Sequence, residues 1–148
     1  MILSPQTIRK LGILTPCMEG DRAFGVSYGL SHAGYDLRIA EDHWLRPGGF
    51  ILASAIEEFS MPSNVVGIVH DKSTWARRGV SVFNTVIEPG WQGFLTMELV
   101  HHGENELYLQ RGMGIAQVIF HFLDEEASRG YSGKYQHQKQ GPQPAIHG

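Results

Sequence analysis

One short segment carries the clearest structural pattern: Phe94-Leu95-Thr96-Met97-Glu98-Leu99-Val100. Apolar and polar side chains alternate along it with a period of two, which is typical of a β-strand and not of a helix. The alternation predicts that Leu95, Met97 and Leu99 share one face, while Thr96 and Glu98 lie on the other. A carboxylate flanked by apolar neighbours has a raised pKa, which suits a general base or acid near neutral pH. For Glu98 taken alone, a solvent-facing position on the strand is the simpler interpretation.

Other short apolar runs occur at residues 49–56, 65–70, 80–83 and 116–123, and turn residues rich in glycine and proline separate them. An edge strand is expected around residues 23–26, and residues 72–78 can form a single helical turn. A short helix is predicted near the start, with Ser4 as its N-cap, Pro5 at its first position and Gly12 at its end. Short strands separated by turn signals predict an all-β fold, either a compact barrel or a sandwich.

The length of 148 residues favours one domain that spans residues 1–148. With 42% hydrophobic and 18% charged residues, the composition is that of a globular protein and excludes a disordered or collagen-like chain. The net charge of −3 argues against a nucleic-acid-binding surface or a basic membrane-binding patch. No apolar run approaches the ~18–20 residues of a membrane span. The N-terminus lacks the pattern of a signal peptide, so we expect a cytoplasmic protein.

Two further segments have residue types that suit nucleotide chemistry. Residues 72–78, Lys72-Ser73-Thr74-Trp75-Ala76-Arg77-Arg78, combine two hydroxyls with three cations. Hydroxyls and guanidinium groups at the start of a helical turn bind phosphate well, although a solvated helix face is the competing interpretation. A second carboxylate, Glu88, opens the turn Glu88-Pro89-Gly90-Trp91. From residue 124 onward the chain is polar, and its composition alone predicts a disordered tail.

The sequence also excludes several enzyme classes. It contains no phosphate-binding loop that ends in Gly-Lys-Ser/Thr, and no Gly-x-Ser-x-Gly elbow. The single cysteine, Cys17, cannot form an internal disulfide and cannot supply the Cys-x-x-Cys pair of a zinc site. The signature of the zinc-dependent nucleobase deaminases is absent, so any deamination by this chain has to proceed without zinc.

Taken together and in order, the motifs resemble those of the dCTP deaminase family in the dUTPase-like superfamily. The similarity covers most of the chain, and although any one motif is weak, their order is specific. The segments that carry it are Gly34-Tyr35-Asp36-Leu37-Arg38, Pro47-Gly48-Gly49-Phe50, Glu58-Phe59-Ser60-Met61-Pro62, Lys72-Ser73-Thr74-Trp75-Ala76-Arg77-Arg78-Gly79, Ile87-Glu88-Pro89-Gly90-Trp91-Gln92-Gly93, Thr96-Met97-Glu98-Leu99, Gly112-Met113-Gly114-Ile115-Ala116-Gln117 and Lys134-Tyr135-Gln136-His137-Gln138.

This resemblance implies a distorted dUTPase-like β-barrel with one or two short helices, which assembles as a homotrimer with active sites at the subunit boundaries. It implies hydrolytic, zinc-independent deamination of dCTP to dUTP and ammonia. The cofactor that it implies is Mg²⁺, bound through the nucleotide triphosphate and by no protein ligand directly. The implied ligands are dCTP and dUTP, with dTTP as a candidate inhibitor.

The resemblance also assigns roles to single residues. Glu98 would take a proton from the water that attacks C4 of cytosine and would deliver it to the leaving ammonia. Ser73 and Arg77, the other catalytic residues, would reach the reacting centre from a neighbouring subunit. Residues 124–148 would form a flexible lid that closes over the nucleotide and excludes water. The implied substrate-binding residues are Lys72, Thr74, Glu88, Trp91, Gln117, Tyr131, Lys134, Tyr135 and Gln138.

Three departures from the family pattern keep alternatives open. The stretch between Arg77 and Glu88 is shorter than in the family, and because it lines the base pocket, a modified cytosine nucleotide is an alternative substrate. Glu88 stands where the family has aspartate. The first motif is closer to that of dUTPases. The alternative functions are a bifunctional dCTP deaminase/dUTPase in which Glu88 acts as a base, a plain dUTP pyrophosphatase, and a non-catalytic dNTP-binding regulatory trimer.

Overall fold

A computed structural model describes residues 1–148, and it confirms the all-β expectation. The two short helices are α1 (Pro5–Leu11) and α2 (Ser73–Ala76). The strands are β1 (Leu14–Thr15), β2 (Asp21–Ala23), β3 (Val26–Leu30), β4 (Tyr35–Arg38), β5 (His43–Leu45), β6 (Phe50–Ser60), β7 (Val65–Asp71), β8 (Val80–Val82), β9 (Val86–Ile87), β10 (Gln92–His101), β11 (Leu107–Leu109) and β12 (Gly114–Phe122).

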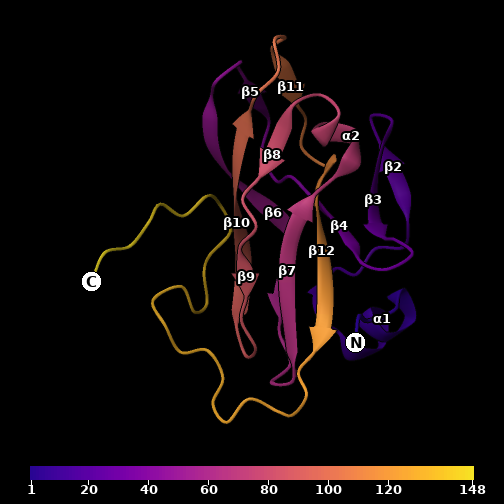
Figure 1. Cartoon of the computed structure of the whole chain (residues 1–148), viewed down its shortest axis with the longest axis vertical. Coiled ribbons are helices and arrows are strands. Elements are labelled where there is room, and N and C mark those ends of the chain that lie inside the picture. Colours follow the sequence, from indigo (N-terminus) through magenta and orange to yellow (C-terminus); the bar gives the residue numbers. More distant parts are fainter.

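Three sheets make up the fold. One sheet has the strand order β2-β3-β4-β12-β7-β9, a second has the order β1-β6-β10-β8, and β11 pairs with β5. The long strands β6, β7, β10 and β12 run along the long axis of the molecule, with the N-terminus and α1 beside β12 and the C-terminal segment beside β10 (Figure 1). The large sheets enclose one apolar core, to which Phe59, Met97, Leu99 and Phe120 contribute fully buried side chains.

The helix predicted at the N-terminus is confirmed in detail. The Ser4 side chain accepts a hydrogen bond from the backbone amide of Thr7, and Gly12 ends α1 in the left-handed conformation with a φ of 63°. The predicted edge strand around residues 23–26 is confirmed only at its two ends, because β2, an edge strand, ends at Ala23, β3 begins at Val26, and Phe24 and Gly25 form the turn between them. Both residues have positive φ values, 51° and 80°, which are outside the extended region.

Strand β10 differs from the predicted alternation at one position. Its pairing with β6 joins Phe94 to Glu58 and then Thr96 to Ser54, so the register shifts by a bulge between Phe94 and Thr96. Met97 and Leu99 are buried in the core as predicted, but Leu95 lines the same pocket as Thr96 and Glu98. A bulge breaks the period of two, and this explains why Leu95 leaves the face that its position predicts.

Residues 124–148 follow β12 without a helix or a long strand of their own. They run back along β10, where Gln138 forms an isolated parallel bridge with Gly93.

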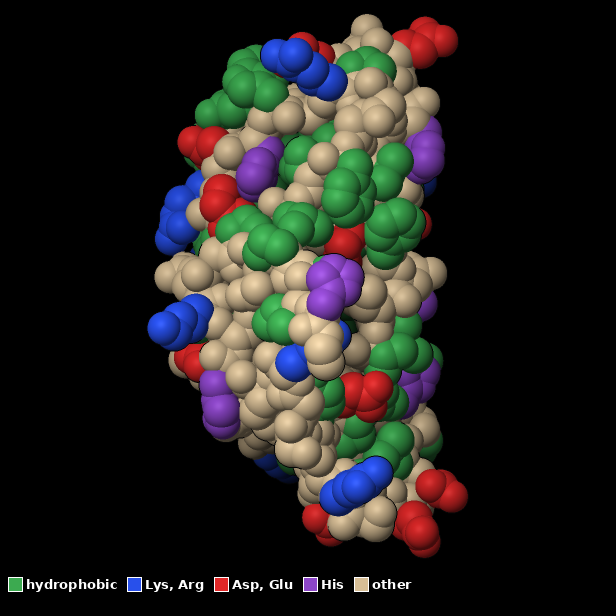
Figure 2. Space-filling model, turned by 90° about the vertical axis from the view of Figure 1, so that its left-hand side faces the viewer, with side chains coloured by type: hydrophobic (Ala, Val, Ile, Leu, Met, Phe, Trp, Pro, Cys, Tyr) green, Lys and Arg blue, Asp and Glu red, His purple; other side chains and the backbone are tan.

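On the face of the molecule that Figure 2 shows, Lys and Arg side chains lie singly and gather into no patch. No helix of the chain has the length and apolar character needed to cross a membrane.

Candidate active site

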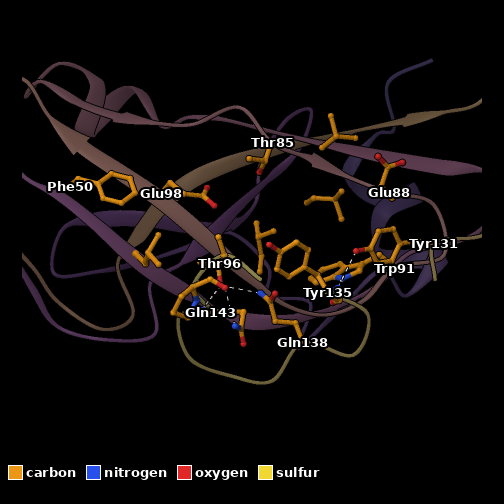
Figure 3. Close-up of a pocket in the computed structure, with 16 residues that line it drawn as sticks. Phe50, Thr85, Glu88, Trp91, Thr96, Glu98, Tyr131, Tyr135, Gln138 and Gln143 are labelled. Atoms are coloured by element: carbon orange, nitrogen blue, oxygen red, sulfur yellow. Dashed lines mark hydrogen bonds between the residues drawn. The ribbon is translucent and has the colours of Figure 1, made fainter. Parts of the chain in front are cut away.

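The main pocket has a volume of about 590 Å³ and lies between β10, the segment around β9 and the C-terminal tail. Its two ends carry the two carboxylates that the sequence singled out, Glu98 at one end and Glu88 at the other (Figure 3). The 16 lining residues are Phe50, Leu52, Thr85, Val86, Ile87, Glu88, Trp91, Leu95, Thr96, Glu98, Tyr131, Tyr135, Gln138, Gln143, Pro144 and Ala145.

Glu98 is half-buried in the wall of this pocket, and its carboxylate lies between Thr85 and Thr96 (Figure 3). Its Oε2 atom is buried and has no hydrogen-bond partner. Burial raises the pKa of the Glu98 carboxyl group, while a backbone hydrogen bond acts weakly in the opposite direction. No cation offsets the loss of hydration, so the structure agrees with the direction of the pKa shift that the apolar neighbours of Glu98 predict. A carboxylate of this kind is free to exchange a proton with a ligand.

The opposite end of the pocket is aromatic. Trp91 is buried, packs against Phe59 at a ring distance of 5.8 Å and donates from Nε1 to the carbonyl of Tyr135 at 2.7 Å. Glu88 is exposed and reaches this end from the turn after β9. The amide of Tyr131 donates to the carbonyl of Pro89 at 2.8 Å, and its hydroxyl accepts from the amide of Tyr135 at 3.1 Å. Flat aromatic walls beside an exposed carboxylate suit a sugar and the base attached to it.

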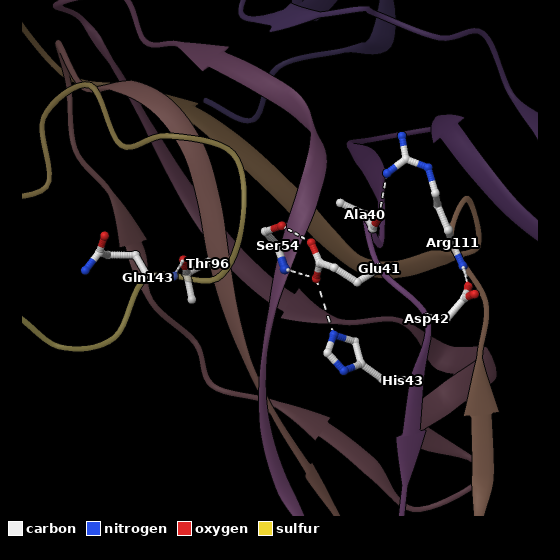
Figure 4. Close-up of polar contacts among 8 residues, drawn as sticks. All are labelled: Ala40, Glu41, Asp42, His43, Ser54, Thr96, Arg111 and Gln143. Atoms are coloured by element: carbon white, nitrogen blue, oxygen red, sulfur yellow. Dashed lines mark hydrogen bonds and ion pairs between the residues drawn. The ribbon is translucent and has the colours of Figure 1, made fainter.

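The C-terminal tail covers the pocket and is held to β10 by hydrogen bonds. Gln138 donates from Nε2 to the carbonyl of Phe94 at 2.8 Å and to the hydroxyl of Thr96 at 3.0 Å. The same hydroxyl accepts the backbone amide of Gln143 at 2.9 Å (Figure 4). Further along, the amide of Ile146 donates to the Tyr135 hydroxyl at 3.0 Å. The tail thus adds three of the predicted substrate-binding residues to the Glu98 pocket, and with Glu88 and Trp91 five of the nine line it: Glu88, Trp91, Tyr131, Tyr135 and Gln138.

Lys134 remains outside this group. Its side chain is exposed, donates to the carbonyl of Ile146 and lies over the ring of Tyr135, with 5.5 Å between Nζ and the ring centroid. The tail thus holds Lys134 beside the pocket without placing it among the lining residues.

The predicted phosphate-binding segment lies elsewhere on the chain. Ser73, Thr74 and Arg77 belong to α2 and its C-terminal end, and none of them lines the Glu98 pocket. Arg77 is exposed and borders a separate hollow beside Arg78. Gln117, on β12, donates to the Ser31 hydroxyl at 3.1 Å and is also absent from the pocket. Within one chain, the structure does not bring Ser73 or Arg77 to Glu98.

Lys72 has a structural role that its position in the motif did not reveal. The side chain is buried, and its ammonium group donates to Asp36 Oδ2 at 2.8 Å and to the Ser27 hydroxyl at 2.8 Å. To reach the ammonium group, a phosphate would have to displace Asp36, which is buried, and Ser27, which is half-buried. The expectation that Lys72 binds substrate therefore lacks geometric support, because the ammonium charge already neutralises a buried carboxylate.

The strand behind the pocket is fixed by a polar cluster that sequence reasoning missed. Ser54, the register partner of Thr96, donates from its amide to Glu41 Oε1 at 2.9 Å and from its hydroxyl to Glu41 Oε2. His43 Nε2 lies 3.3 Å from the same carboxylate (Figure 4). Nearby, the amide of Arg111 donates to Asp42 at 2.7 Å. These contacts hold the turn before β5 against β6 and so support the wall of the pocket.

The charges in the pocket define what it can bind. Its lining includes two carboxylates and no lysine or arginine. A nucleoside fits such a lining, whereas a triphosphate needs cationic donors that the pocket of one chain does not contain. Thr85, Thr96 and Gln143 also line the pocket, although the sequence assigned a role to none of them.

Comparison with known proteins agrees with this class of fold. In the computed structure the chain resembles 2′-deoxycytidine 5′-triphosphate deaminase from Agrobacterium tumefaciens, with a TM-score of 0.68 and 16% identity over 83% of this chain and 49% of that one. It also resembles a dUTPase from phage phi11 of S. aureus, with a TM-score of 0.59 and 15% identity over 80% of this chain and 92% of that one. The architecture is thus that of the dUTPase-like proteins.

Within that class, sequence identifies the family. Residues 36–123 match the model of the dCTP deaminase-like family, and the chain belongs to it. The dCTP deaminase of Campylobacter hominis is 35% identical, with 93% of this chain and 90% of the relative aligned. The dCTP deaminase of Herpetosiphon aurantiacus is 33% identical, with 91% of each chain aligned. The Campylobacter alignment extends over 170 positions, which exceeds the 148 residues of this chain, so the relative has segments that this chain lacks.

Proposed function

We propose that this chain deaminates dCTP by hydrolysis to dUTP and ammonia, without zinc. The observation that carries the proposal is the Glu98 carboxylate, which faces a nucleoside-sized pocket with one buried oxygen free of any partner. The named activity of the relatives supports the same substrate class.

In the proposed mechanism Glu98 acts twice. Its ionised carboxylate accepts a proton from a water molecule as the water oxygen attacks C4 of cytosine. The same group then gives the proton to the N4 nitrogen, the C4–N4 bond breaks and ammonia leaves. A raised pKa of Glu98 favours this proton transfer to N4, because a larger fraction of the carboxyl group is protonated near neutral pH and can act as the general acid.

We propose an orientation of the nucleotide in the pocket from the position of Glu98. With C4 at Glu98, the deoxyribose points toward the other end of the pocket, where Trp91 and Tyr131 offer flat apolar surfaces. We place Glu88 near the 3′-hydroxyl of the sugar, since it is the carboxylate at that end. The tail residues Tyr135 and Gln138 lie along the side of the pocket between these two ends.

A second subunit supplies the phosphate donors in this proposal. The pocket lacks cations, while Ser73, Thr74 and Arg77 lie outside it and present two hydroxyls and an exposed guanidinium group. We propose a homotrimer in which α2 of one subunit approaches the Glu98 pocket of the next, with Gln117 on the strand beside it. Mg²⁺ would be carried by the triphosphate, where it neutralises phosphate charge. The dUTPase of phage phi11 is described with a structural Mg(II) ion.

The tail completes the site. We propose that residues 1–148 form one domain and that residues 124–148 act as its lid, with Lys134 turning to the phosphates when nucleotide binds. Support comes from the hydrogen bonds that join Gln138 and Gln143 to Thr96, two residues from Glu98. A tail held by a few side-chain contacts can open at modest cost and can exclude water once closed.

The first test is a product analysis by anion-exchange chromatography after incubation with dCTP and Mg²⁺. We expect dUTP from the natural chain and none from Glu98→Gln, whereas the exposed Glu58→Gln should behave like the natural chain. Full activity of Glu98→Gln would overturn the mechanism.

Mixed trimers test the shared site. Glu98→Gln and Arg77→Ala should each be inactive, but an equimolar mixture that is unfolded and reassembled should regain about a quarter of the activity, because one intact site then forms from two damaged chains. A mixture as inactive as its parents, or a stable monomer by light scattering, would contradict the shared site.

Hydrolysis of dUTP to dUMP is a second candidate activity, favoured by the second carboxylate in the pocket and by the fold shared with dUTPases. Here Glu88 would activate the water that attacks phosphorus. Release of dUMP from dUTP, lost in Glu88→Gln while deamination persists, would establish a bifunctional enzyme. Tight binding of dCTP or dTTP without any turnover would instead indicate a regulatory trimer.

A further inference from the structure

The two sides of Glu98 differ in polarity. Strand β10 lies between β6 and β8, so Glu98 has β6 on one side and the segment after β8 on the other. On β6 its register partner is Leu52, and both Leu52 and Phe50 line the pocket. On the other side the amide of Phe83 donates to the Glu98 carbonyl at 3.1 Å, and Thr85 two residues later lines the pocket. The carboxylate therefore stands between an apolar wall and a hydroxyl-bearing segment.

The apolar wall is open to a ligand. Phe50 and Phe83 are 56% and 52% exposed, although large apolar side chains are usually buried. Their rings lie 6.2 Å apart, and Phe50 lies at the end of the pocket beyond Glu98 (Figure 3). Apart from Glu98 itself, no charged side chain lines this end.

A cytosine ring has matching asymmetry. N1, which carries the sugar, and C4, which carries the amino group, lie on opposite sides of the ring. The two positions beside C4 are C5, an apolar C–H group, and N3, a hydrogen-bond acceptor. If N3 faced Leu52 and Phe50, the acceptor would lose its hydration without a partner, which costs free energy. The favourable orientation therefore turns N3 toward Thr85 and C5 toward Leu52.

We infer that Leu52 and Phe50 form a subsite for a small alkyl substituent at C5, so that 5-methylcytosine deoxynucleoside triphosphate is a substrate. The inference rests on the proposed deamination at Glu98. Water adds to C4, the C4–N4 bond breaks and ammonia leaves, while the methyl group is unchanged. The products are dTTP and ammonia. Leu52 is the specificity-determining residue, since it is the direct neighbour of Glu98 on the apolar side.

The test is a competition between equimolar dCTP and 5-methyl-dCTP, with the ratio of dTTP to dUTP as the readout. Burial of one methyl group predicts a ratio of kcat/KM values about four- to tenfold in favour of 5-methyl-dCTP. Leu52→Phe fills the subsite and should lower this ratio at least about tenfold. The control Val86→Phe adds bulk to the pocket on the Thr85 side and should leave the ratio unchanged. Because the readout is a ratio, general damage to the enzyme cancels.

A natural chain that turns over dCTP but disfavours 5-methyl-dCTP by tenfold or more would overturn the inference, as would a ratio insensitive to Leu52→Phe. If neither nucleotide is turned over, the proposed deamination fails, and calorimetric binding of the same two nucleotides decides on the subsite. Tighter binding of 5-methyl-dCTP that Leu52→Phe abolishes supports it. Equal, weaker or absent binding overturns it.

Discussion

Replacing Glu98 with glutamine should raise stability while it abolishes deamination. The carboxylate is half-buried, has one buried oxygen without a partner and has a raised pKa. A carboxyl group whose pKa is higher in the folded than in the unfolded state binds more protons when folded. Its contribution to the free energy of unfolding therefore falls as pH rises from the ordinary glutamate pKa through the folded value. Glutamine has the same shape and no charge, so it avoids this penalty.

The magnitude follows from the burial. An unpaired buried polar group costs about 1–3 kcal/mol, and partial exposure of Glu98 reduces this to about 0.5–1 kcal/mol by solvent screening. For a chain of this size that gain corresponds to a Tm increase of about 2–4 °C. It should be present at pH 8 and should vanish below about pH 4, where the Glu98 carboxyl group is protonated in both states. The same substitution should lower kcat by about a hundredfold or more, since general acid–base catalysis is lost.

Thermal unfolding of both proteins from pH 4 to pH 8 measures the effect, with Glu58→Gln as control because Glu58 is an exposed glutamate on the neighbouring strand. The control should show no pH-dependent gain. A Tm difference that is the same at every pH, or a Glu98→Gln variant less stable than the natural chain at pH 8, would refute the idea that the unpartnered charge is costly.

Three other substitutions test the frame around the site. Lys72→Ala leaves Asp36 charged and buried, so it should lower the free energy of unfolding by about 3–5 kcal/mol, and unchanged stability would restore Lys72 as a candidate phosphate ligand. Gly93 has a φ of 147°, and a Cβ there would lie 2.7 Å from the Gln138 amide nitrogen. Gly93→Ala should therefore release the tail and speed tryptic cleavage at Lys134, whereas an unaltered cleavage rate would show that the tail docks without this contact. Thr96→Val removes the acceptor of both tail hydrogen bonds and should raise KM for the nucleotide; a KM equal to that of the natural chain would argue against the lid.

The sequence predicted those features that depend on local chemistry. The helix α1 follows from Ser4, Pro5 and Gly12, each of which acts within one turn of the chain. The raised pKa of Glu98 follows from its apolar neighbours on the strand, because their burial also removes water from the Glu98 carboxylate. The order of the motifs identified the family correctly, since it reflects the whole chain and not one segment.

Features that depend on contacts between distant segments could not be predicted in this way. The Lys72 ammonium group is buried because Asp36 and Ser27, far away in the sequence, meet it in the interior. Leu95 faces the pocket because a bulge in the pairing with β6 interrupts the alternation of apolar and polar side chains along β10. The sequence of β10 contains no signal that predicts this bulge. The placement of the tail depends on Thr96 and Phe94, whose roles as acceptors appear only once the tail lies beside β10.

The rigidity of β10 explains why Glu98 can remain without a partner. Met97 and Leu99, on either side of it, are buried in the core, and pairing with β6 and β8 fixes the backbone on both edges. A carboxylate on a mobile loop would move until it found a donor or bulk water, which would return its pKa to the ordinary range. On this strand, such a movement would pull Met97 or Leu99 out of the core and cost more than it gains. The packing energy of two apolar residues thus maintains the raised pKa of the carboxyl group between them, and a cavity-forming substitution such as Met97→Ala should lower that pKa even though Met97 never touches the nucleotide.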